Sequence, residues 1–393
     1  MKITKGIKVG VTSMDDTKIW SNGLYQNAYH LANILSAAGY DCDMITESKE
    51  ISENKFLEKQ IVLLTDDNLG DYDIIFEVVH TLRDSTVPKF KAKGGIVAGI
   101  QYGNEFMIDV MADSIYRPEK PPRVNKQDRD AVLMSPHFDF SQQAISIMYD
   151  LDVKVCPYIW SPKFLVMHEK EEELKFDPEK EMKSIAVMES NLYFVKTCHI
   201  PMLAIEHVYR ENPELFEYAY IVGSKILEPS KGFIRFANLL NVKKDKKMFF
   251  EPRYRFPFLI KRGYSDVIVS HQHYNALNYL QLEAMYLGKP FIHNSHYFKD
   301  NGYYYHDFNA KDAAAQIKNA FENHKNVFEE KMEKDREKVY EYHPDNPKNI
   351  EGYAELVEWL LEKRAKENKK SKLFIQGKQK GSAKAKKPRR KLL

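Results

Sequence analysis

Residues 265–294 read SDVIVSHQHYNALNYLQLEAMYLGKPFIHN, and this stretch predicts three consecutive elements of an α/β fold. The β-branched run at its start predicts a strand, and the apolar run at its end predicts a second one. Between them, Asn278 can cap a helix of about residues 279–287, because Gln281 three positions on makes a pattern much like a capping box. Gly288 closes the helix. A strand, a helix and a strand in this order are the repeating unit of a parallel α/β sheet.

A single acid, Glu283, lies within the most hydrophobic part of this predicted helix. The helix N-terminus is expected at the carboxyl end of a strand, where its free N–H groups and positive dipole suit an anion such as a diphosphate. Glu283 follows one turn later, and its carboxylate can accept hydrogen bonds from both hydroxyls of a ribose. The alternative is an ordinary core helix in which a first-turn acid interacts favourably with the helix dipole.

The same alternation of strands and helices runs through the first half of the chain. It begins with a strand, IKVGVTS, at residues 7–13. A helix with apolar residues at helical spacing follows, and then a strand, DMIT, at residues 43–46. This opening is typical of a Rossmann-like domain. Further buried strands are predicted at residues 72–79, 94–103, 131–136 and 153–160.

A charged segment at residues 168–183, HEKEEELKFDPEKEMK, predicts a solvated linker or helix, after which the pattern restarts. We therefore expect an α/β fold of two Rossmann-like domains, residues 1–165 and 180–345, which face a central cleft. Ligands of such sheets bind outside the carboxyl ends of the strands. An amphipathic helix at residues 346–367 is expected to pack on the body, and a disordered basic tail at residues 368–393 to follow it.

Length and composition indicate a globular protein of two domains. The chain has 393 residues, of which 43% are hydrophobic and 12% aromatic. No apolar stretch reaches the roughly 18–20 residues of a membrane span, and the N-terminal strand lacks the features of a signal peptide. Cys42, Cys156 and Cys198 are too far apart for a disulfide framework or a CxxC metal site, so we expect a cytoplasmic location.

The charges are distributed unevenly. Residues 368–393 carry eleven lysines and arginines and no acid, so the net charge of +3 leaves about −8 on the rest of the chain when these eleven are subtracted. The basic segment is either a solvated arm or a means of attachment to a polyanion, since lysine and arginine contacts to phosphates give sequence-independent, salt-sensitive affinity. Anionic lipid headgroups would attract it too.

The segment EAMYLGKPFIHN resembles the donor-site signature of GT-B glycosyltransferases, in which an E-x7-E stretch precedes a small residue, Gly, x, Pro and an apolar strand. Glu283 falls on the second acid, which holds the ribose of the nucleotide in that superfamily. The first acid falls on Asn275, so the signature is half kept. The resemblance implies a metal-independent GT-B enzyme with no cofactor, whose co-substrate is a nucleotide sugar, expected to be UDP-linked.

A second resemblance covers roughly residues 7–362. The chain is similar to an uncharacterised bacterial and phage family that is described as glycosyltransferase-like and of unknown function. The resemblance lies in the segments WSNGLYQN (20–27), CPYIWSP (156–162), VMESNLYFVK (187–196), VSHQHYNALNYLQLE (269–283) and FIHNSHYFKDNGYYY (291–305).

The second domain supplies the predicted donor site. Basic residues near its first strand neutralise the leaving diphosphate in GT-B enzymes, a role that the resemblance gives to Lys196 or Arg253. A pair of surface arginines, Arg253 and Arg255, is the alternative. The predicted donor-binding residues are Glu283, Asn278, Asn275, His271, Glu189, Asn191, Lys196 and Arg253.

The histidines of the second domain raise the question of a metal. In the H-x-H pair of His271 and His273, the two rings would point to opposite faces of a strand end, which is poor geometry for binding one ion. No acidic pair of the DxD type accompanies them or His293 and His296. We therefore expect no metal, and expect one or two of these histidines to line the nucleotide pocket.

The first domain is expected to offer the acceptor. Its first β-α turn carries Asn22, Gly23, Gln26 and Asn27, in a loop that faces the cleft in GT-B folds; a helix cap with surface amides is the alternative. Deprotonation of an acceptor hydroxyl needs a general base if the anomeric centre is inverted. The candidates for this base are His80, Asp16 and Glu105.

The sequence thus predicts a glycosyltransferase. The basic tail, together with the phage members of the family, leads to the hypothesis that the acceptor is DNA with hydroxymethylated bases, modified in the host cytoplasm if a phage encodes the protein. One alternative is transfer to a surface polysaccharide or protein. The other is a non-catalytic nucleic-acid-binding protein on a degenerate transferase scaffold, which the loss of the first motif acid would allow.

Overall fold

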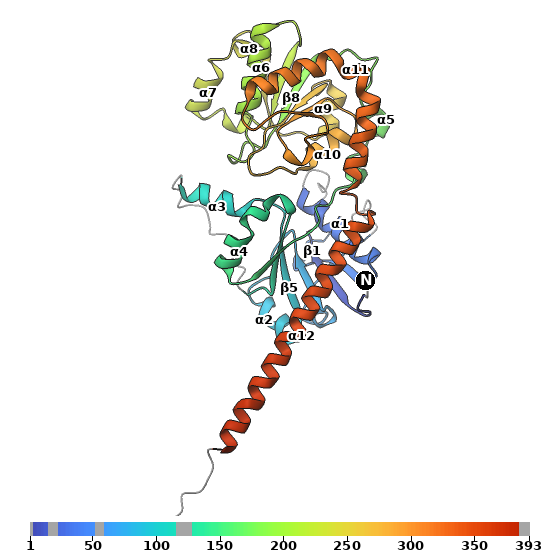
Figure 1. Ribbon diagram of the computed structural model, residues 1–393, viewed down its shortest axis with the longest axis vertical. Helices are drawn as coiled ribbons and strands as arrows, with labels where there is room; N and C mark the ends of the chain where they lie inside the picture. Colours follow the sequence, from blue (N-terminus) through green and yellow to red (C-terminus); the bar gives the residue numbers. More distant parts are fainter. Residues whose placement is uncertain (1–2, 15–22, 52–58, 115–127, 385–393) are drawn as a thin grey trace, which may run out of the picture.

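The computed structural model describes residues 3–14, 23–51, 59–114 and 128–384, and the side chains of the last helix as far as Lys369. It contains two α/β domains stacked end to end, with the C-terminal helix running along the first of them (Figure 1). Among the described residues, no helix combines the length and the apolar character that a membrane crossing needs.

The first domain is built on a seven-stranded parallel sheet of order β3-β2-β1-β4-β5-β6-β7. Its strands carry nearly continuous apolar runs because helices cover both faces of a parallel sheet. Val9, for example, is fully buried and pairs with Cys42 on one side and Ile74 on the other. The strands are β1 (Lys8–Thr12), β2 (Asp41–Thr46), β3 (Ile61–Leu63), β4 (Ile74–Glu77), β5 (Ile96–Gln101), β6 (Ala131–Met134) and β7 (Asp152–Val155).

The helices of the first domain connect these strands. The longest, α1, follows the first strand and is buried around most of its circumference, because it packs against both the sheet and α12. The α-helices are α1 (Gly23–Ala37), α2 (Thr86–Ala92), α3 (Glu105–Ser114) and α4 (Gln142–Tyr149). Three short 3-10 helices are η2 (Leu69–Asp71), η3 (Pro136–Ser141) and η4 (Pro162–Phe164), and the charged linker predicted between the domains contains one helical turn, α5 (Glu171–Leu174).

The second domain has a six-stranded parallel sheet of order β10-β9-β8-β11-β12-β13. Its first strand, β8, therefore lies in the middle of the sheet and pairs with β11, the first of the two strands in the stretch 265–294. The strands are β8 (Ser184–Met188), β9 (Tyr218–Val222), β10 (Met248–Glu251), β11 (Val267–Val269), β12 (Phe291–His293) and β13 (Tyr303–Tyr304). The helices are α6 (His199–Glu211), η5 (Lys225–Leu227), α7 (Lys231–Ala237), α8 (Asn241–Lys244), α9 (Phe256–Arg262), α10 (Tyr279–Tyr286), η6 (His296–Phe298) and α11 (Ala310–Tyr340).

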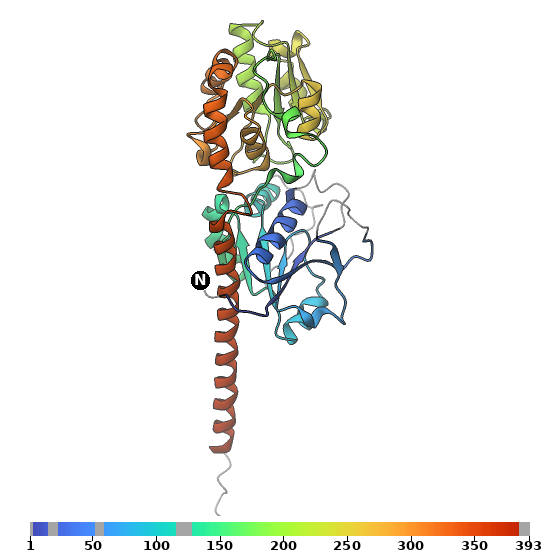
Figure 2. The same cartoon turned by 90° about the vertical axis from the view of Figure 1, so that its right-hand side faces the viewer.

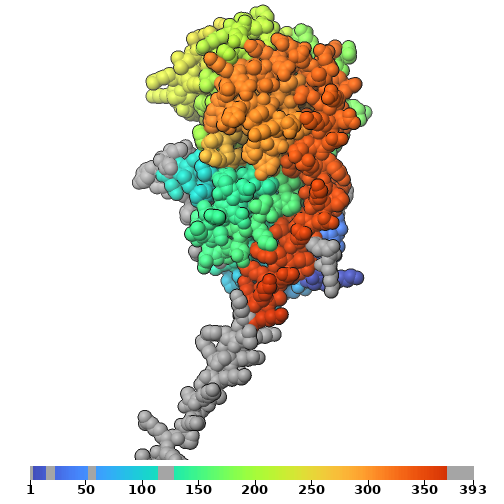
Figure 3. All heavy atoms as spheres, in the orientation of Figure 1, coloured from blue at the N-terminus to red at the C-terminus, as the bar shows by residue number. Residues whose placement is uncertain are grey.

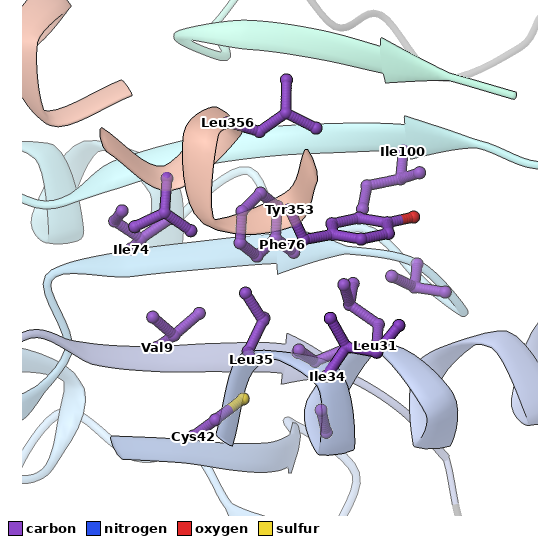
Figure 4. Packing of buried hydrophobic residues seen from close by; sticks show 14 of the residues in the cluster. Val9, Leu31, Ile34, Leu35, Cys42, Ile74, Phe76, Ile100, Tyr353 and Leu356 are labelled. Carbon is purple, nitrogen blue, oxygen red and sulfur yellow. The ribbon is translucent and has the colours of Figure 1, made fainter. Parts of the chain in front are cut away.

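The last helix, α12 (Pro347–Lys384), crosses back to the first domain and packs along it (Figures 1 and 2). In the space-filling view, α11 covers one side of the second domain and α12 continues the same side onto the first (Figure 3). Tyr353 and Leu356 of α12 lie in one core with Leu35 of α1 and Phe76 of β4 (Figure 4). The first domain is thus completed by a segment from the far end of the chain.

The helix α12 is longer than the sequence predicted. A helix at residues 346–367 followed by a disordered tail was expected, whereas α12 continues to Lys384 and includes much of the basic segment. Lysine, glutamine and alanine are good helix formers, and an existing helix is extended one residue at a time at little cost. The basic residues up to Lys384 therefore continue a helix that is anchored on the first domain.

The two domains contact each other through α10 and the loop before it. The hydroxyl of Tyr279 lies 2.6 Å from Oδ1 of Asn27, in α1, and 2.9 Å from the carbonyl oxygen of Ile159. The amide of Asn104, just before α3, donates to the carbonyl oxygen of Tyr274 at 2.6 Å. These hydrogen bonds hold the N-terminus of α10 against the first domain.

Candidate active site

A cavity of about 750 Å³ lies between the two domains. Residues at the carboxyl ends of β8, β9 and β10 line it on one side, together with the N-terminus of α10, and the start of α1 lines it on the other. This is where ligands of parallel α/β sheets bind. Nine of the predicted site residues line the cavity: Gly23, Gln26, Asn27, Glu189, Lys196, Arg253, Asn275, Asn278 and Glu283.

The N-terminus of α10 has the capping box that the sequence predicted. Oδ1 of Asn278 accepts a hydrogen bond from the backbone N–H of Leu280 at 2.8 Å, and Oε1 of Gln281 accepts one from the N–H of Asn278 at 3.1 Å. The helix begins at Tyr279 and leads into strand β12. Its positive end therefore lies at the cavity, as an anion-binding helix requires.

Glu283 lies one turn into α10 and lines the same cavity. Burial raises its pKa to about 7, and the nearby guanidinium of Arg253 opposes this shift. The carboxyl group is therefore partly protonated at neutral pH, since its surroundings stabilise the charge less than water does. A ligand that donates hydrogen bonds to it would stabilise the ionised form.

Glu189 directly follows β8 and is a second carboxyl group at the cavity, only 2% exposed. Its Oε1 accepts hydrogen bonds from the hydroxyl of Ser270 at 2.6 Å and the backbone N–H of His271 at 3.0 Å. Its Oε2 is buried and has no hydrogen-bond partner in the described structure. Burial raises the pKa of Glu189 to about 7, although the hydrogen bond from Ser270 and the charge of Lys196 lower it. One oxygen is therefore fixed, and the other is available to a ligand.

Lys196 and Arg253 bring positive charge to this side of the cavity. Burial lowers the pKa of Lys196, an effect that Glu189 opposes and Arg253 reinforces. Arg253 is exposed to solvent at the cavity wall. Two cations beside a helix N-terminus provide the charges that a diphosphate needs.

Asn275, which occupies the position of the first motif acid, lines the cavity and is 5% exposed. Its side-chain amide donates a hydrogen bond to Oε1 of Gln272, whose own amide nitrogen is buried without a partner in the described structure. The two amides therefore form a neutral pair where GT-B enzymes have a carboxylate.

Two predicted donor residues do not line the cavity. His271 is fully buried: its Nδ1 lies 2.9 Å from the hydroxyl of Tyr305, and burial lowers its pKa to about 4. Asn191 has a left-handed backbone, and its side chain is used locally: Oδ1 accepts from the N–H of Cys198 and Nδ2 donates to the carbonyl oxygen of Glu189. Both residues shape the walls around Glu189 rather than the cavity surface.

Of the candidates for the general base, the two that the structure describes, His80 and Glu105, do not line the cavity. His80 has both ring nitrogens at backbone carbonyl oxygens, Nδ1 at 3.0 Å from that of Thr81 and Nε2 at 3.1 Å from that of Ser13. Both ring nitrogens thus face backbone oxygens of the first domain rather than the cavity. Glu105 begins α3 and accepts a hydrogen bond from Gln101 at 3.1 Å, away from the cavity lining.

The first β-α turn is only partly described. Asn22 and Asp16 lie outside the described residues, whereas Gly23, Gln26 and Asn27 line the cavity as expected. A Cβ atom at Gly23 would be 3.7 Å from the ring of Tyr279, which is ordinary contact. Gly23 is therefore not required by a close contact with the protein itself.

The sequence analysis missed residues that join the domains. Tyr279 and Asn104 make hydrogen bonds across the domain interface, and Tyr274 has a left-handed φ of 50°. Gly223 was also missed: its φ is 77°, and a Cβ there would lie 2.4 Å from the carbonyl oxygen of Glu189. Local periodicity carries no sign of these roles, because each depends on a partner distant in sequence.

A family model matches residues 6–357 of the chain. It describes a protein of unknown function, DUF2827. The chain belongs to this family. No curated protein is similar enough in sequence to count as a match.

Solved structures similar to this DUF2827 protein are glycosyltransferases. A glycosyltransferase from Rickettsia africae has a TM-score of 0.58 at 15% identity over 91% of this chain and 99% of its own. HepE of Anabaena, solved with UDP and glucose, has a TM-score of 0.54 at 12% identity over 90% and 99%. The pneumococcal O-GlcNAc transferase GtfA, solved with UDP and GlcNAc, has a TM-score of 0.52 at 10% identity over 91% and 100%.

These similarities establish the predicted GT-B fold of two Rossmann-like domains for the DUF2827 chain. The prediction that the rings of His271 and His273 point to opposite faces was wrong, because residues two apart along an extended segment share a side. Both rings contact Phe308, with centroids at 4.6 Å and 5.0 Å. Within the described ranges, no group of three or more histidine, cysteine, aspartate or glutamate residues is placed to hold a metal ion.

Proposed function

We propose that this protein is a glycosyltransferase that uses a nucleotide sugar, UDP-linked, as its donor. The observation that carries the proposal is the meeting of Glu283, the capped N-terminus of α10 and two cations in one cavity. A ribose diol fits the carboxylate of Glu283, and a diphosphate fits the helix N-terminus with Lys196 and Arg253. The UDP bound by HepE and GtfA, which share the fold, supports this choice of nucleotide.

The reaction would break the bond between the anomeric carbon and the diphosphate oxygen, and form a bond from that carbon to the acceptor oxygen. The acceptor proton leaves with a base or with the departing diphosphate. Negative charge grows on the diphosphate as its bond breaks, so Lys196, Arg253 and the α10 dipole stabilise the transition state more than the bound donor. The chain itself provides this positive charge, and we therefore expect transfer to proceed without a metal ion.

Glu189 is the residue that we assign to the donor sugar. Asn275 cannot supply the charge of the first motif acid, but Glu189 lines the same cavity from the end of β8. Its Oε2 is buried without a partner, and a sugar hydroxyl could donate to it. In this proposal the carboxylate that contacts the donor sugar comes from the end of β8, rather than from the loop after β11 where Asn275 lies. Asn275 and Gln272 add neutral amide groups to the same site.

The test is turnover of a donor panel by the full-length protein. UDP-glucose, UDP-GlcNAc, UDP-galactose, GDP-mannose and ADP-glucose are each incubated with it, with and without EDTA, and released nucleoside diphosphate is measured. We expect at least one UDP-sugar to be consumed, equally in EDTA, and Glu283→Gln to slow this roughly 10- to 100-fold. Glu333→Gln, an exposed acid on α11, is the matched control. If none of these donors is bound or consumed, the proposal fails.

The hypothesis of a DNA acceptor rests on the basic segment and the family resemblance alone, and a cytoplasmic location belongs to the same hypothesis. It predicts that a chain ending at Glu367 binds hydroxymethylated duplex DNA more weakly and with a smaller dependence on salt. Unchanged affinity and salt dependence would remove its basis. Mass spectrometry of nucleosides from DNA incubated with protein and donor tests the transfer itself.

A further inference from the structure

Five rings that the donor site does not use are in contact across the domain interface, beside the cavity. His273 is at their centre, with ring centroids 4.1 Å from Tyr274, 4.9 Å from Phe194 and 5.0 Å from Phe308. Phe140 of the first domain adds a fifth ring, 5.4 Å from Tyr274. We call these five residues the aromatic platform.

The platform is exposed although it is largely apolar. Phe140, Phe194, Tyr274 and Phe308 are 49%, 50%, 50% and 42% exposed. Isolated apolar residues on a surface are ordinary, but a contiguous apolar patch marks a binding site. The rings come from three segments of the second domain and one of the first, so the patch exists only when the two domains stand as they do here.

Backbone strain at Tyr274 indicates that the platform is built for a purpose. Its φ of 50° is rare for a bulky residue and costs energy that the surroundings must offset. Asn104 of the first domain, buried to 97%, donates to the carbonyl oxygen of Tyr274 at 2.6 Å and so holds this conformation. The strain places the Tyr274 ring between Phe140 and His273.

The platform lacks positive charge. No described lysine or arginine stacks on its five rings, and burial lowers the pKa of His273, although Asp307 opposes this shift. The cations of the site, Lys196 and Arg253, line the cavity instead. A polyanion would need positive charge along the surface that it occupies. A neutral ligand therefore fits the platform better than a nucleic acid strand.

The platform is also continuous with the donor cavity. Tyr274 directly precedes Asn275, and Phe194 lies two residues before Lys196; both Asn275 and Lys196 line the cavity. One end of an oligomeric ligand bound to the rings would thus reach the predicted position of the donor sugar.

We propose that the aromatic platform binds a neutral saccharide chain and presents its terminal hydroxyl to the donor. A pyranose ring has flat C–H faces that pack on aromatic rings and a rim of hydroxyls for hydrogen bonds with Tyr274, His273 and Asn275. The assignment of this chain as acceptor rests on the proposed transferase function. The binding surface itself does not.

The experiment measures binding without any donor. Maltohexaose, cellohexaose, chitohexaose and a 20-nucleotide single-stranded DNA are each mixed with full-length protein, and saturation-transfer NMR records contact between ligand C–H groups and the protein. We expect at least one oligosaccharide to bind. Phe140→Ala and Phe308→Ala should each weaken it by roughly three- to tenfold, whereas Phe140→Trp should retain it.

Leu239→Ala is the matched control, because Leu239 is an exposed apolar residue (65%) of the second domain outside the platform. Sedimentation of wild type and Phe140→Ala is run in parallel. The proposal is overturned if no oligosaccharide binds, if only the DNA binds, if platform variants bind like Leu239→Ala, or if wild type is a dimer that Phe140→Ala dissociates. Oligosaccharide binding without turnover of any donor would support the platform while refuting the transferase.

Discussion

Glu189 and Glu283 come from different elements, and burial raises the pKa of each to about 7. Two acids of this kind in one cavity are unusual in a merely structural site, because an unliganded protein gains nothing from their desolvation. The side chain of Asn191, by contrast, is used by local partners, Cys198 and the backbone of Glu189. The chemistry of the site is therefore expected to depend on these two carboxyl groups.

The role of Glu283 on the ribose predicts a preference among nucleotides. Wild-type protein should bind UDP roughly tenfold or more tightly than 2′-deoxy-UDP, because the latter lacks one hydroxyl that donates to a charged acceptor. Glu283→Gln should bind both with similar affinity, and Glu333→Gln should keep the preference. Isothermal titration calorimetry measures the six dissociation constants, two for each of the three proteins. A preference that survives in Glu283→Gln would place the ribose elsewhere.

The burial of Glu189 predicts a stability that depends on pH. Its pKa is about 7 in the folded chain and near 4.5 when unfolded, so between these values the folded state binds more protons. The free energy of unfolding therefore falls as pH rises. Relative to Glu189→Gln, wild type should lose on the order of 3 kcal/mol between pH 5 and pH 8, measured by urea denaturation. A difference that does not change with pH would mean that the carboxyl group is not desolvated.

At the scale of elements, the first turn of α10 has two roles, capping of the helix and the proposed binding of the diphosphate, and substitutions can separate them. The capping box fixes where the helix begins, and the same first turn provides the free N–H groups at the cavity. Asn275 and Tyr279, on either side of Asn278 in the sequence, both line the cavity, and the hydroxyl of Tyr279 also donates a hydrogen bond to Asn27 of the first domain.

Substitution of the cap separates these tasks. Asn278→Ala removes the side-chain acceptor and should destabilise the protein by about 1 kcal/mol. Asn278→Asp keeps the cap and the stability but adds a negative charge where the diphosphate is proposed to bind, so UDP affinity should fall more than in Asn278→Ala. Urea denaturation and calorimetry give the two quantities. If Asn278→Asp binds UDP as wild type does, the diphosphate lies away from this helix.

At the scale of the whole molecule, the chain crosses between the domains twice, through the linker after β7 and again before α12. Tyr353, Leu356 and Leu360 of α12 lie in the core of the first domain. Because α12 directly follows the last helix of the second domain, its packing both stabilises the first domain and restricts where the second domain can lie. The cavity and the aromatic platform both depend on this arrangement, since each takes residues from both domains.

Two truncations test the role of α12. A chain ending at Glu367 should keep its thermal midpoint, because the residues removed lie beyond Leu360. A chain ending at Asp345 should lose more than about 10 °C, since the first domain then lacks five buried apolar side chains, those of Tyr353, Ala354, Leu356, Val357 and Leu360. Leu356→Ala, expected to cost about 2–5 kcal/mol, gives the same information if the shorter chain does not fold. An unchanged midpoint in both short variants would show that α12 is dispensable.

Much of the fold was predictable because it depends on local pattern. Strands β1, β4, β5, β8 and β11 are mostly continuous apolar runs. The start of α10 was predictable from the spacing of Asn278 and Gln281, which form its capping box. The boundary of α12 was not predictable, since composition alone does not distinguish a solvated basic arm from a helix extended from an anchored start. The position of His80 was not predictable either, because its ring nitrogens lie at the carbonyl oxygens of Ser13 and Thr81, contacts that no local pattern reveals.

The sequence by itself determined the two Rossmann-like halves, the helix at 279–287 and the acid within it, because hydrophobic periodicity and capping act over a few residues. Only the tertiary structure decided that Glu189 faces the same cavity as Asn275 and that Phe140 meets Tyr274. Both depend on the order of strands in a sheet and on how one domain sits against the other. Contacts between residues so far apart in the chain are set by packing, which leaves no periodic trace in the sequence.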